Sequence, residues 1–371
     1  MTEFDTFTEA DDLGPAKVVH LTERRTGLRA VVVIDNVAAG PAIGGTRMAP
    51  DMTTRVCARL ARAMTLKNAM AGLRHGGAKS GIVADPGMPA ADKERLIRAF
   101  AAAVGDLTDY IPGPDMGTDE AAMAVVFDEI GRAVGLPAAL GGLPLDELGA
   151  TGFGVAEGAE VAAAMLGIDL DGARVVVQGY GAVGRHAARF LGARGSVLVA
   201  ASDSRGGVVD PSGLDLETLD GIKSRGGSVA DYPGESMVVE RDEVFTVDCD
   251  LLIPAAGPDA IRADNVDDVK ARLVLQGANI PATLDAETRL HQRGIVSVPD
   301  FVINAGGVIC GAVEYAHGTR TQAFEAIAES VRGNVEEVLA RSRETGRTPR
   351  EVALDMAHIR VRRAMETRRW T

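Results

Sequence analysis

The chain has 371 residues, more than one hydrophobic core usually serves, so we expect two domains. Its composition of 46% hydrophobic, 25% charged and 4% aromatic residues is typical of a globular α/β protein. The formal net charge of -13 argues against binding to nucleic acid or to an acidic membrane surface, because both require a clustered basic surface.

The cysteines and the apolar runs limit the expected cellular setting. Cys57, Cys249 and Cys310 lie far apart and are odd in number, so we expect neither a disulfide framework nor a Cys-x-x-Cys metal site. Residues 1–14 lack the apolar core of a signal peptide, and no run of about 18 apolar residues follows. We therefore expect a cytoplasmic protein with no membrane partner and no metal.

The first part of the chain alternates strand and helix signals. The β-branched run 28–34 predicts a strand that leads into a glycine-rich turn over 40–47. A helix is expected after Thr53 and Thr54, which are good N-caps. Its apolar stripe at helical spacing consists of Val56, Leu60, Met64 and Ala71, and Lys67 falls on the same stripe.

A glycine-rich loop over 75–81, a short strand over 82–84 and a helix from Asp92 to Val104 follow. These signals predict an N-terminal domain of mixed α/β structure over residues 1–145. We place the domain boundary in the stretch 143–151, which contains Gly, Pro and acidic residues.

The second part has a different rhythm. After a helix over 155–166, five short apolar runs alternate with helical or loop segments, which is typical of a parallel sheet. The runs are Val175 to Val177, Val197 to Ala201, Leu251 to Ile253, Leu273 to Leu275 and Ile295 to Val298. They predict a Rossmann-type doubly wound parallel sheet over residues 146–320. We expect C-terminal helices over 321–371 to pack back toward the first domain.

Each apolar run ends in Gly, Pro or polar residues, and in open α/β sheets ligands bind beyond the carboxyl ends of the strands. We therefore expect one crevice to collect these ends, with Ala255 and Ala256 among the residues that contact a cofactor. The ends are Gly179-Tyr180-Gly181, Ser202-Asp203, Pro254-Ala255-Ala256, Gly277-Ala278-Asn279 and Pro299-Asp300.

The first of these ends carries a complete G-x-G-x-x-G spacing, Gly179-Tyr180-Gly181-Ala182-Val183-Gly184, between a strand and a helix. Glycine permits the tight turn and the approach of backbone amides to a pyrophosphate, which the helix N-terminus attracts. Asp203 lies 19 residues after Gly184, where the fingerprint expects a carboxylate that binds the adenosine ribose. The glycines alone fit an ordinary tight turn, but the combination predicts a dinucleotide site.

NAD is the expected cofactor, because the Asp203 carboxylate would repel the 2′-phosphate of NADP. Arg205 leaves NADP open, since an arginine at this place can pair with that phosphate. Arg205 is equally consistent with a solvated turn residue.

Three charged residues of the first part are candidates for chemistry. An unpaired ammonium at Lys67 would be costly on an apolar helical face, so Lys67 either pairs with a substrate carboxylate or extends its amine to water. Lys79 stands between glycines, where a ligand can approach, and serves as a general base or is simply a loop lysine. Asp115, framed by Pro and Gly in a rigid turn, exchanges a proton with a substrate amine or caps the helix that follows.

Several runs resemble the glutamate/leucine/phenylalanine/valine dehydrogenase family in the same order over nearly the whole chain. They are Lys67-Asn68-Ala69, Gly76-Gly77-Ala78-Lys79, Pro114-Asp115-Met116-Gly117-Thr118, Ala150-Thr151-Gly152, Gly277-Ala278-Asn279, Pro299-Asp300 and Asn304-Ala305-Gly306-Gly307-Val308.

The resemblance implies NAD-dependent reversible oxidative deamination of an L-amino acid to a 2-oxo acid and ammonia. It implies that Lys67 binds the substrate α-carboxylate, Lys79 is the acid/base lysine and Asp115 transfers protons. Cofactor contacts would come from Thr151, Asn279 and Asn304, the last also holding substrate. The first domain would then bind substrate and form a homo-oligomer with a mobile cleft, and the second would bind NAD.

Ile43, Gly44 and Gly45, at the first glycine pair, are expected to bind the substrate. Family members that act on glutamate carry a lysine directly before the equivalent of Gly44-Gly45, where this chain has Ile43. They carry a serine seven residues after the equivalent of Asn304, where this chain has Gly311. Burying a γ-carboxylate beside Ile43 without a cation would cost several kcal/mol, so an apolar substrate of the leucine, valine or phenylalanine type is expected.

Small residues at Gly113 and Gly311 would leave space for a large apolar side chain. The segment from Asp169 to Pro233 resembles the glutamate branch instead, so glutamate stays an alternative. A hydroxy-acid dehydrogenase would more naturally use a histidine paired with a carboxylate, and of the six histidines only His75 neighbours the proposed site. A nucleotide sensor without catalysis would not require Lys67, Lys79 and Asp115 together.

Overall fold

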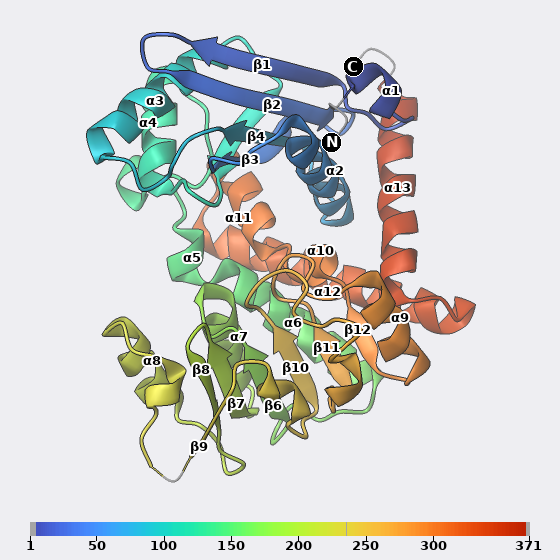
Figure 1. The fold of residues 1–371 in the computed structure, drawn as a ribbon. Helices are drawn as coiled ribbons and strands as arrows, with labels where there is room; N and C mark the ends of the chain where they lie inside the picture. Colours follow the sequence, from blue (N-terminus) through green and yellow to red (C-terminus); the bar gives the residue numbers. More distant parts are fainter. Residues whose placement is uncertain (1–4, 235, 369–371) are drawn as a thin grey trace. The chain divides into compact units, whose positions relative to one another are not determined.

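The computed structural model describes residues 5–234 and 236–368, so the outermost residues of the expected first and last domains lie outside the described part. The chain divides into two compact units (Figure 1). The first unit comprises the described parts of Met1–Leu145, Val308–Ala323 and Leu354–Thr371, and the second unit comprises those of Asp146–Gly307 and Phe324–Ala353.

These limits coincide with the expected ones at residue 145 and differ after residue 307. Residues 308–320, expected in the second domain, belong to the first unit because Ala312 and Tyr315 pack on a cluster around Ile43. The C-terminal residues, expected as one segment, are shared between the two units. Local periodicity gives no information about such distant packing partners.

The first unit is built on a sheet of five strands in the order β1-β2-β4-β3-β5 together with helices, which confirms the predicted mixed α/β structure. β3 is parallel to both β4 and β5, whereas β1–β2 and β2–β4 are antiparallel. The strands are β1 (Lys17–Glu23), β2 (Leu28–Asn36), β3 (Ala42–Met48), β4 (Gly77–Ile82) and β5 (Tyr110–Pro114). The helices are α1 (Thr6–Glu9), α2 (Thr54–Met70), α3 (Ala90–Ala103), α4 (Glu120–Ile130) and the 3-10 turn η1 (Ala138–Leu140).

Two segments expected to be a turn and a loop are strands in the centre of this sheet. The 40–47 segment forms most of β3, and the 75–81 segment forms most of β4. Glycine has low strand propensity, but here it permits close packing, since a Cβ on Gly44 would overlap the carbonyl of Ala78 and one on Gly77 would overlap the backbone of Thr65. Lys79 therefore lies within a strand and not in a loop.

The face of α2 that is buried differs from the expected stripe. Thr53 caps the helix as expected, its side chain accepting a hydrogen bond from the Val56 N–H. The buried residues are Cys57, Ala61, Thr65, Asn68 and Met70, whereas Val56, Leu60, Met64 and Lys67 are only partly buried. Of the expected apolar stripe only Ala71, just after the helix, is buried, so the stripe expectation was wrong for the helix itself. Apart from Met70, the buried residues of α2 have small side chains, which allows the helix to lie close to β4.

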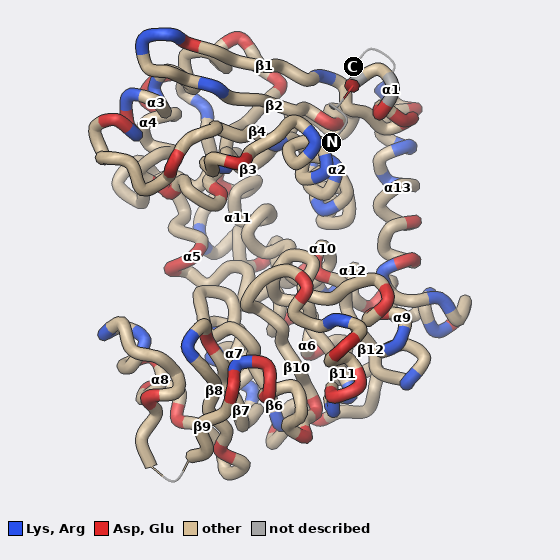
Figure 2. The backbone as a smooth tube through the Cα atoms, viewed as in Figure 1, with Lys and Arg blue, Asp and Glu red and all other residues tan. Residues whose placement is uncertain are grey.

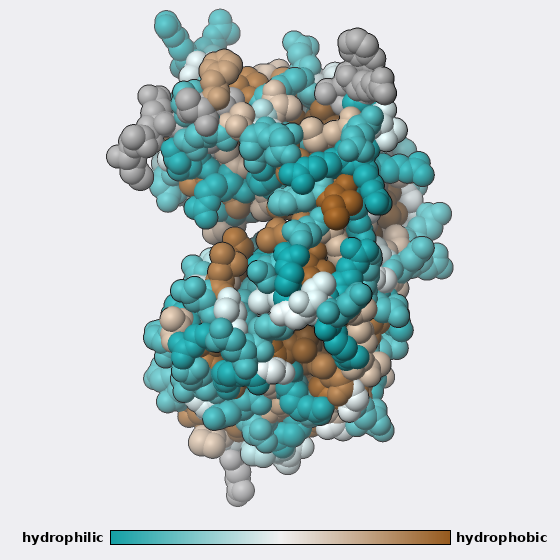
Figure 3. All heavy atoms as spheres, turned by 90° about the vertical axis from the view of Figure 1, so that its right-hand side faces the viewer, coloured by the Kyte–Doolittle hydropathy of each residue, from teal (hydrophilic) through white to brown (hydrophobic). Residues whose placement is uncertain are grey.

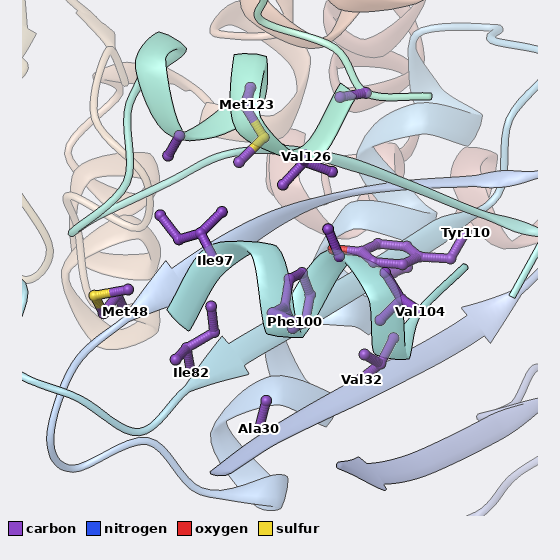
Figure 4. Close-up of a cluster of buried hydrophobic side chains, with 14 of the residues drawn as sticks. Ala30, Val32, Met48, Ile82, Ile97, Phe100, Val104, Tyr110, Met123 and Val126 are labelled. Atoms are coloured by element: carbon purple, nitrogen blue, oxygen red, sulfur yellow. The ribbon is translucent and has the colours of Figure 1, made fainter. Parts of the chain in front are cut away.

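A hydrophobic core joins α3 and α4 to one face of the first sheet. Figure 4 shows Phe100 of α3 and Val104, the C-cap of that helix, beside Val32 of β2, with Met123 and Val126 of α4 across from them. Phe100, Val104 and Val32 are fully buried. This core fixes strands β2 to β5, and thereby the residues carried by β3, β4 and β5.

The second unit contains a sheet of seven strands in the order β12-β11-β10-β6-β7-β8-β9. The five expected runs form the five strands from β12 to β7, all parallel, as predicted. β8 and β9 add antiparallel strands at one edge, which the sequence analysis did not anticipate. The strands are β6 (Arg174–Gln178), β7 (Val197–Asp203), β8 (Gly206–Val209), β9 (Met237–Val239), β10 (Leu251–Pro254), β11 (Leu273–Leu275) and β12 (Val296–Val298).

Helices connect these strands and continue to the C-terminal part of the chain. They are α5 (Leu145–Leu148), α6 (Ala150–Met165), α7 (Ala182–Gly192), α8 (Leu216–Ser224), α9 (Leu284–Gln292), α10 (Asp300–Ile303), α11 (Gly306–Tyr315), α12 (Arg320–Thr345) and α13 (Pro349–Thr367). The 3-10 turns are η2 (Val229–Asp231), η3 (Glu243–Thr246) and η4 (Val266–Asp268). α12 and α13 are separated at Gly346, which has a left-handed φ of 70°.

Charged residues of both signs are interspersed along the backbone (Figure 2), and hydrophilic residues predominate on the face drawn in Figure 3. Within residues 5–234 and 236–368, no helix combines the length and the apolar character that a membrane crossing requires. The same residues include no group of three or more His, Cys, Asp or Glu side chains placed to hold a metal ion.

Candidate active site

The first unit brings Lys79 and Asp115 into an ion pair. Lys79 lies in β4, and Asp115 directly follows β5, on the other side of the intervening strand β3. Arg47 of β3 adds a second cation, its Nε and Nη2 lying 3.3 and 3.4 Å from the two Asp115 carboxylate oxygens. The side chains of Lys79 and Asp115 are only 8% and 15% exposed, so the pair is shielded from water.

Gly45 of β3 makes room for this pair. A Cβ at Gly45 would lie 2.9 Å from Asp115 Cβ and 3.1 Å from Lys79 Nζ. The absence of a side chain therefore leaves the space above the strand to the two charged groups. Gly45 was expected to bind substrate, and the structure places it in direct contact with the two catalytic candidates.

The turn that carries Asp115 is fixed by Thr118. The Asp115 N–H donates to Thr118 Oγ1 over 3.0 Å, and Thr118 Oγ1 donates to the Thr46 carbonyl over 2.7 Å. Asp115 does not cap α4, because Asp119 accepts the hydrogen bond from the Ala122 N–H at that helix start. Of the two roles open for Asp115 in the sequence, helix capping is wrong.

Burial and charge shift the titration of both partners. Burial lowers the pKa of Lys79, with Arg47 adding to the effect and Asp115 opposing it. Burial opposes ionisation of Asp115, but Lys79 and then Arg47 outweigh it and hold the pKa of that carboxyl below its usual range. A lysine with a lowered pKa beside an ionised carboxylate is suited to acid/base chemistry.

The Cys57 thiol and the Tyr110 phenol, which lie near the ion pair, stay protonated at neutral pH. Burial raises the pKa of Cys57 to about 12 and that of Tyr110 to about 12, so both stay protonated. The Tyr110 hydroxyl lies 2.8 Å from Ser80 Oγ and 3.2 Å from Thr46 Oγ1 beneath the sheet. These contacts stabilise strands β3 to β5, and neither group is a nucleophile at neutral pH.

Ile43 lies in an apolar cluster near Gly113 and Gly311, the two glycines expected to leave space for a substrate side chain. Ile43, Ile111 and Val134 are buried together, and Ala312 and Tyr315 of α11 pack on them. Val134 lies close to both glycines. A Cβ built on Gly113 would be 3.1 Å from Val134 Cγ2, and a Cβ built on Gly311 would be 3.7 Å from the same atom. The space expected at Gly113 is therefore largely taken by Val134.

Lys67 lies in the last turn of α2 and is partly buried. Its neighbour Asn68 donates from Nδ2 to the Gly76 carbonyl over 2.7 Å, which ties the end of α2 to the start of β4. Lys67 is thus on the helix that covers the strand of Lys79. Its role in binding a carboxylate stays a prediction.

The second unit holds the glycine fingerprint between β6 and α7. Gly179 has a φ of 98° and packs against the backbone of Ala256, and Gly184 packs against the Gly179 carbonyl, so both need glycine for the turn itself. A Cβ at Gly181 would meet nothing within 4 Å. Gly181 is also the N-cap of α7, and no side chain caps that helix.

The side chain of Tyr180 points away from this turn. It is 1% exposed, and its hydroxyl donates to Asp220 Oδ1 over 3.3 Å. Only the backbone of Tyr180 is available to a ligand. Ala182 begins α7, and Val183 in its first turn lies beside Ala255 near Gly277, because a Cβ at Gly277 would meet both at 3.3 Å.

Asn304 ends α10 beside the loop after β11. Its Nδ2 donates to the Gly277 and Ala278 carbonyls over 3.3 and 3.1 Å and to Asn279 Oδ1 over 3.2 Å. Its Oδ1 is buried and has no hydrogen-bond partner among the described residues. Thr151, in the first turn of α6, lies next to Gly306, so Asn279, Thr151 and Asn304 gather at one end of the second sheet.

Asp203 ends β7 as expected, but its carboxylate already accepts four hydrogen bonds from neighbouring groups of the protein. Oδ1 accepts from the Arg205 N–H and Ser228 Oγ, at 2.9 and 2.8 Å. Oδ2 accepts from Lys223 Nζ at 2.6 Å and from the Val229 N–H at 3.0 Å. Burial would raise the pKa of Asp203, but these donors, Lys223 first, hold it at about 2.

Comparison with known proteins gives the family. The model for Glutamate/Leucine/Phenylalanine/Valine dehydrogenase matches residues 141–369, and that for the Glu/Leu/Phe/Val dehydrogenase dimerisation domain matches residues 16–132. The chain belongs to the glutamate/leucine/phenylalanine/valine dehydrogenase family. It is therefore an amino-acid dehydrogenase, an oxidoreductase that acts on CH–NH2 groups with NAD(P).

Several relatives cover most of this dehydrogenase. A glutamate dehydrogenase from Thermotoga maritima is 40% identical over 330 residues, 85% of this chain and 77% of the relative. An NADP(+)-dependent glutamate dehydrogenase from Pyrobaculum calidifontis is 38% identical over 363 residues, 90% of this chain and 85% of the relative. The Leu-bound crystal structure of hetero-hexameric glutamate dehydrogenase from Thermus thermophilus matches with a TM-score of 0.85 and 32% identity, covering 96% of this chain and 90% of that one.

The second unit of this dehydrogenase fits an NAD(P) molecule. At Gly181 neither close packing nor a left-handed φ requires a glycine. The space beside Gly181 is open and lies at the start of α7, whose first N–H groups have no side-chain cap, so a pyrophosphate can bind there. The orphaned Asn304 Oδ1 offers an acceptor to a carboxamide or ribose hydroxyl. The Gly179 to Gly184 turn would hold the phosphates, and Asn279, Thr151 and Asn304 the nicotinamide half.

Three residues of this dehydrogenase were missed by the sequence analysis. Arg47 lies two positions after Gly45, on the same face of β3, and the alternation would have revealed it had 42–48 been interpreted as a strand. Lys223 and Val134 contact Asp203 and Gly113 from distant segments, and no local signal in the sequence marks them.

Proposed function

We propose that this amino-acid dehydrogenase uses Lys79 as the acid/base residue and Asp115 as the proton-transferring residue in reversible oxidative deamination. The observation that supports this assignment is the shielded Lys79–Asp115 pair beside Gly45, with Arg47 as an additional cation. Burial lowers the pKa of Lys79, which favours the neutral amine that a general base requires, and Lys79 and Arg47 keep Asp115 ionised as a proton acceptor.

The reaction requires protons to move at nitrogen and at water. Asp115 takes a proton from the substrate ammonium, which leaves a lone pair that expels the Cα hydride. When bound, a nicotinamide would supply the hydride acceptor. The neutral Lys79 amine then removes a proton from water as its oxygen bonds to the iminium carbon. Lys79 then returns that proton to the nitrogen, which makes ammonia the leaving group. The Lys79 amine, neutral again, removes the hydroxyl proton as the C–N bond breaks, and this releases ammonia and the 2-oxo acid.

Lys67 supplies the third element of the proposal. Its ammonium binds the α-carboxylate of the amino acid, which places the amine toward Lys79 and Asp115. The position of Lys67 on the helix covering β4 supports this role. A carboxylate bound by one lysine is held mainly by charge, since an ammonium is a point charge and not a planar fork.

Glutamate is the first substrate candidate. Relatives that are 38% to 40% identical over 85% to 90% of this chain are named as glutamate dehydrogenases. Similarity of this extent supports glutamate better than the leucine, valine or phenylalanine preference expected from the sequence. Its γ-carboxylate would need a cation from outside the cluster of Ile43, Ile111 and Val134, which is apolar.

An amino acid with an apolar side chain is the second candidate, and the Ile43 cluster favours it. Ile43 is 5% exposed, Ile111 is fully buried and Val134 is 5% exposed, so a substrate side chain beside them would meet hydrocarbon. Val134 narrows the space near Gly113, which favours leucine or valine over phenylalanine.

We also propose a homo-oligomer assembled through the first unit. Residues 16–132 match a domain described as a dimerisation domain, and the similar Thermus thermophilus enzyme is hetero-hexameric. Light scattering during size-exclusion chromatography tests this, and a mass of one chain, 38.6 kDa, would contradict it.

The deciding experiment measures formation of reduced nicotinamide with glutamate, leucine, valine and phenylalanine, each with NAD and with NADP. Glutamate is expected to give the highest kcat/KM, and a higher value for leucine or valine would establish the second candidate. If NADH binds but no L-amino acid is oxidised, the proposed catalytic roles of Lys79 and Asp115 are wrong.

A further inference from the structure

A buried arginine joins three elements of the second unit. Arg350, in the first turn of α13, is 12% exposed in its side chain. Its Nε donates to both carboxylate oxygens of Glu287 on α9, each over 2.8 Å. Its Nη2 donates to Gln276 Oε1 and to Asp300 Oδ1, again over 2.8 Å. One guanidinium thus ties α9, the end of β11 and α10 to the start of α13.

The network continues from Asp300 into residues 277–280, here called the 277–280 loop. Asp300 Oδ2, the oxygen not bonded to Arg350, accepts a hydrogen bond from the Ile280 N–H over 2.9 Å. Asn304, the C-cap of α10, donates from its side-chain amide to the Gly277 and Ala278 carbonyls and to Asn279 Oδ1. Both ends of the loop therefore depend on α10, and α10 is anchored by Arg350.

The backbone of the loop needs such support. Ile280 has a φ of 51°, in the left-handed region that β-branched residues strongly disfavour. Its side chain is 48% exposed, so packing does not account for the conformation. Two hydrogen bonds hold its peptide groups: the Ile280 N–H donates to the Asp300 carboxylate, and the Asp259 N–H donates to the Ile280 carbonyl, each over 2.9 Å.

We propose that Arg350 is a positioning residue of the NAD(P) site, which holds the strained 277–280 loop, and with it Asn279, in the conformation that binds the cofactor. The proposal rests on the cofactor role assigned to Asn279 and Asn304. Arg350 itself acts through Asp300 and is not among the residues proposed to contact the cofactor.

The geometry requires an arginine at this position. The planar fork donates to acceptors on three residues at once, whereas a lysine offers a point charge with freely rotating donors. Asp300 must use one oxygen for the guanidinium and the other for the Ile280 N–H. Loss of the fork leaves Asp300 free to rotate, and the strained peptide then relaxes toward a negative φ.

Two variants test the proposal while keeping the fold. Arg350→Lys retains the charge but removes the fork, and Asp300→Asn retains the shape but can satisfy only one of its two partners with its single acceptor oxygen. Both are expected to raise the dissociation constant for NADH, followed by fluorescence, about tenfold or more. KM for the amino acid is expected to stay unchanged. Arg341→Lys is the control, on an exposed arginine of α12 that pairs with Glu337.

Rescue at Ile280 separates positioning from general destabilisation. Glycine adopts a left-handed φ without strain, so adding Ile280→Gly to Arg350→Lys is expected to restore most of the NADH affinity. A purely structural role for Arg350 predicts a lower Tm with unchanged NADH affinity, or a loss of affinity that Ile280→Gly does not repair. Either result would overturn the proposal.

The outcome is distinguishable from failure of the proposed reaction. A wild-type protein that binds NADH without deaminating any amino acid would refute the roles of Lys79 and Asp115, and the NADH titrations would still decide the role of Arg350. A wild-type protein that does not bind NADH would refute the cofactor site and this proposal together.

Discussion

Lys79 and Asp115 meet above Gly45 of β3, where a Cβ would lie 2.9 Å from Asp115 Cβ and 3.1 Å from Lys79 Nζ. Lys79 lies on β4, Gly45 on β3 and Asp115 directly after β5. Because these three strands are adjacent, the sheet sets the distances between the three residues. A site carried by strands is more rigid than a site carried by loops. The pair is therefore positioned before any substrate binds.

Replacement of Lys79 by alanine is expected to reduce kcat by about 10²- to 10⁴-fold, the usual contribution of a general acid or base. NADH binding is expected to persist, because the nucleotide residues belong to the other unit. Steady-state kinetics and fluorescence titration measure the two effects. Lys17→Ala is the control, since the Lys17 side chain is 50% exposed and pairs with Asp109. Near-normal turnover in Lys79→Ala would remove Lys79 from the mechanism.

Arg47→Gln is expected to move the pH dependence of amino-acid oxidation. The base must be neutral, so kcat/KM rises as the pH passes the pKa of Lys79. Arg47 lowers that pKa by charge repulsion, and its removal therefore raises the pKa and shifts the rising limb to higher pH. The pKa of Asp115 rises as well, because Arg47 stabilises its ionised form.

The pH profiles of kcat/KM for wild type and Arg47→Gln, at saturating cofactor, measure this shift. Arg95→Gln serves as the control, because Arg95 is 72% exposed and pairs only with Asp92 on its own helix among the described contacts. A rising limb that stays in place, or moves to lower pH, would show that Arg47 is not electrically coupled to the base.

The contrast between the two sheets shows what the sequence can reveal. The parallel strands of the second unit were predictable, because runs such as Val175 to Val177 are β-branched, short and bounded by glycine. Strands β3 and β4 were not predictable, because Gly44, Gly45 and Gly77 are residues typical of turns. Only the neighbouring strand and helix, which come too close for a Cβ, explain glycine at these positions.

The candidate site was predictable in part for the same reason. Lys79, Asp115 and Gly45 were singled out from the sequence, and the structure brings them together. Their partner Arg47 was overlooked because its segment was interpreted as a turn. Contacts such as Arg350 with Glu287 join positions far apart in the sequence, and without the fold no periodicity links them.

Ile43→Lys is expected to increase kcat/KM for glutamate relative to leucine. A lysine ammonium in place of an isoleucine that is 5% exposed would be buried in an apolar cluster, so a γ-carboxylate would be its most favourable partner. The expected change in the ratio is about tenfold or more. Ile43→Leu, which keeps the cluster apolar, is the control. A glutamate-to-leucine ratio that does not rise would mean that another residue contacts the substrate side chain.

Lys223→Ala is expected to lower the preference for NADP over NAD. Lys223 neutralises Asp203, whose carboxylate would otherwise repel a 2′-phosphate, as the sequence analysis assumed. Because the two side chains are only 23% and 9% exposed, solvent screens the unpaired charge weakly, and the kcat/KM ratio of NADP to NAD is expected to fall about tenfold. Kinetics with both cofactors at fixed amino acid measure the ratio.

Acid stability gives an independent readout of the same pair. Asp203 titrates at about 2 in the folded chain, below its unfolded value, so its carboxylate stabilises the fold above about pH 4, and this is lost as the pH falls toward 2. Removing the Lys223 ammonium raises the pKa of Asp203, so unfolding in acid is expected to begin at higher pH. Lys270→Ala, at an exposed lysine of the same unit, controls for the loss of a positive charge. If Lys223→Ala changes neither the cofactor ratio nor the acid transition, the Asp203 charge is neutralised by its N–H and hydroxyl donors, and Lys223 does not control the choice of cofactor.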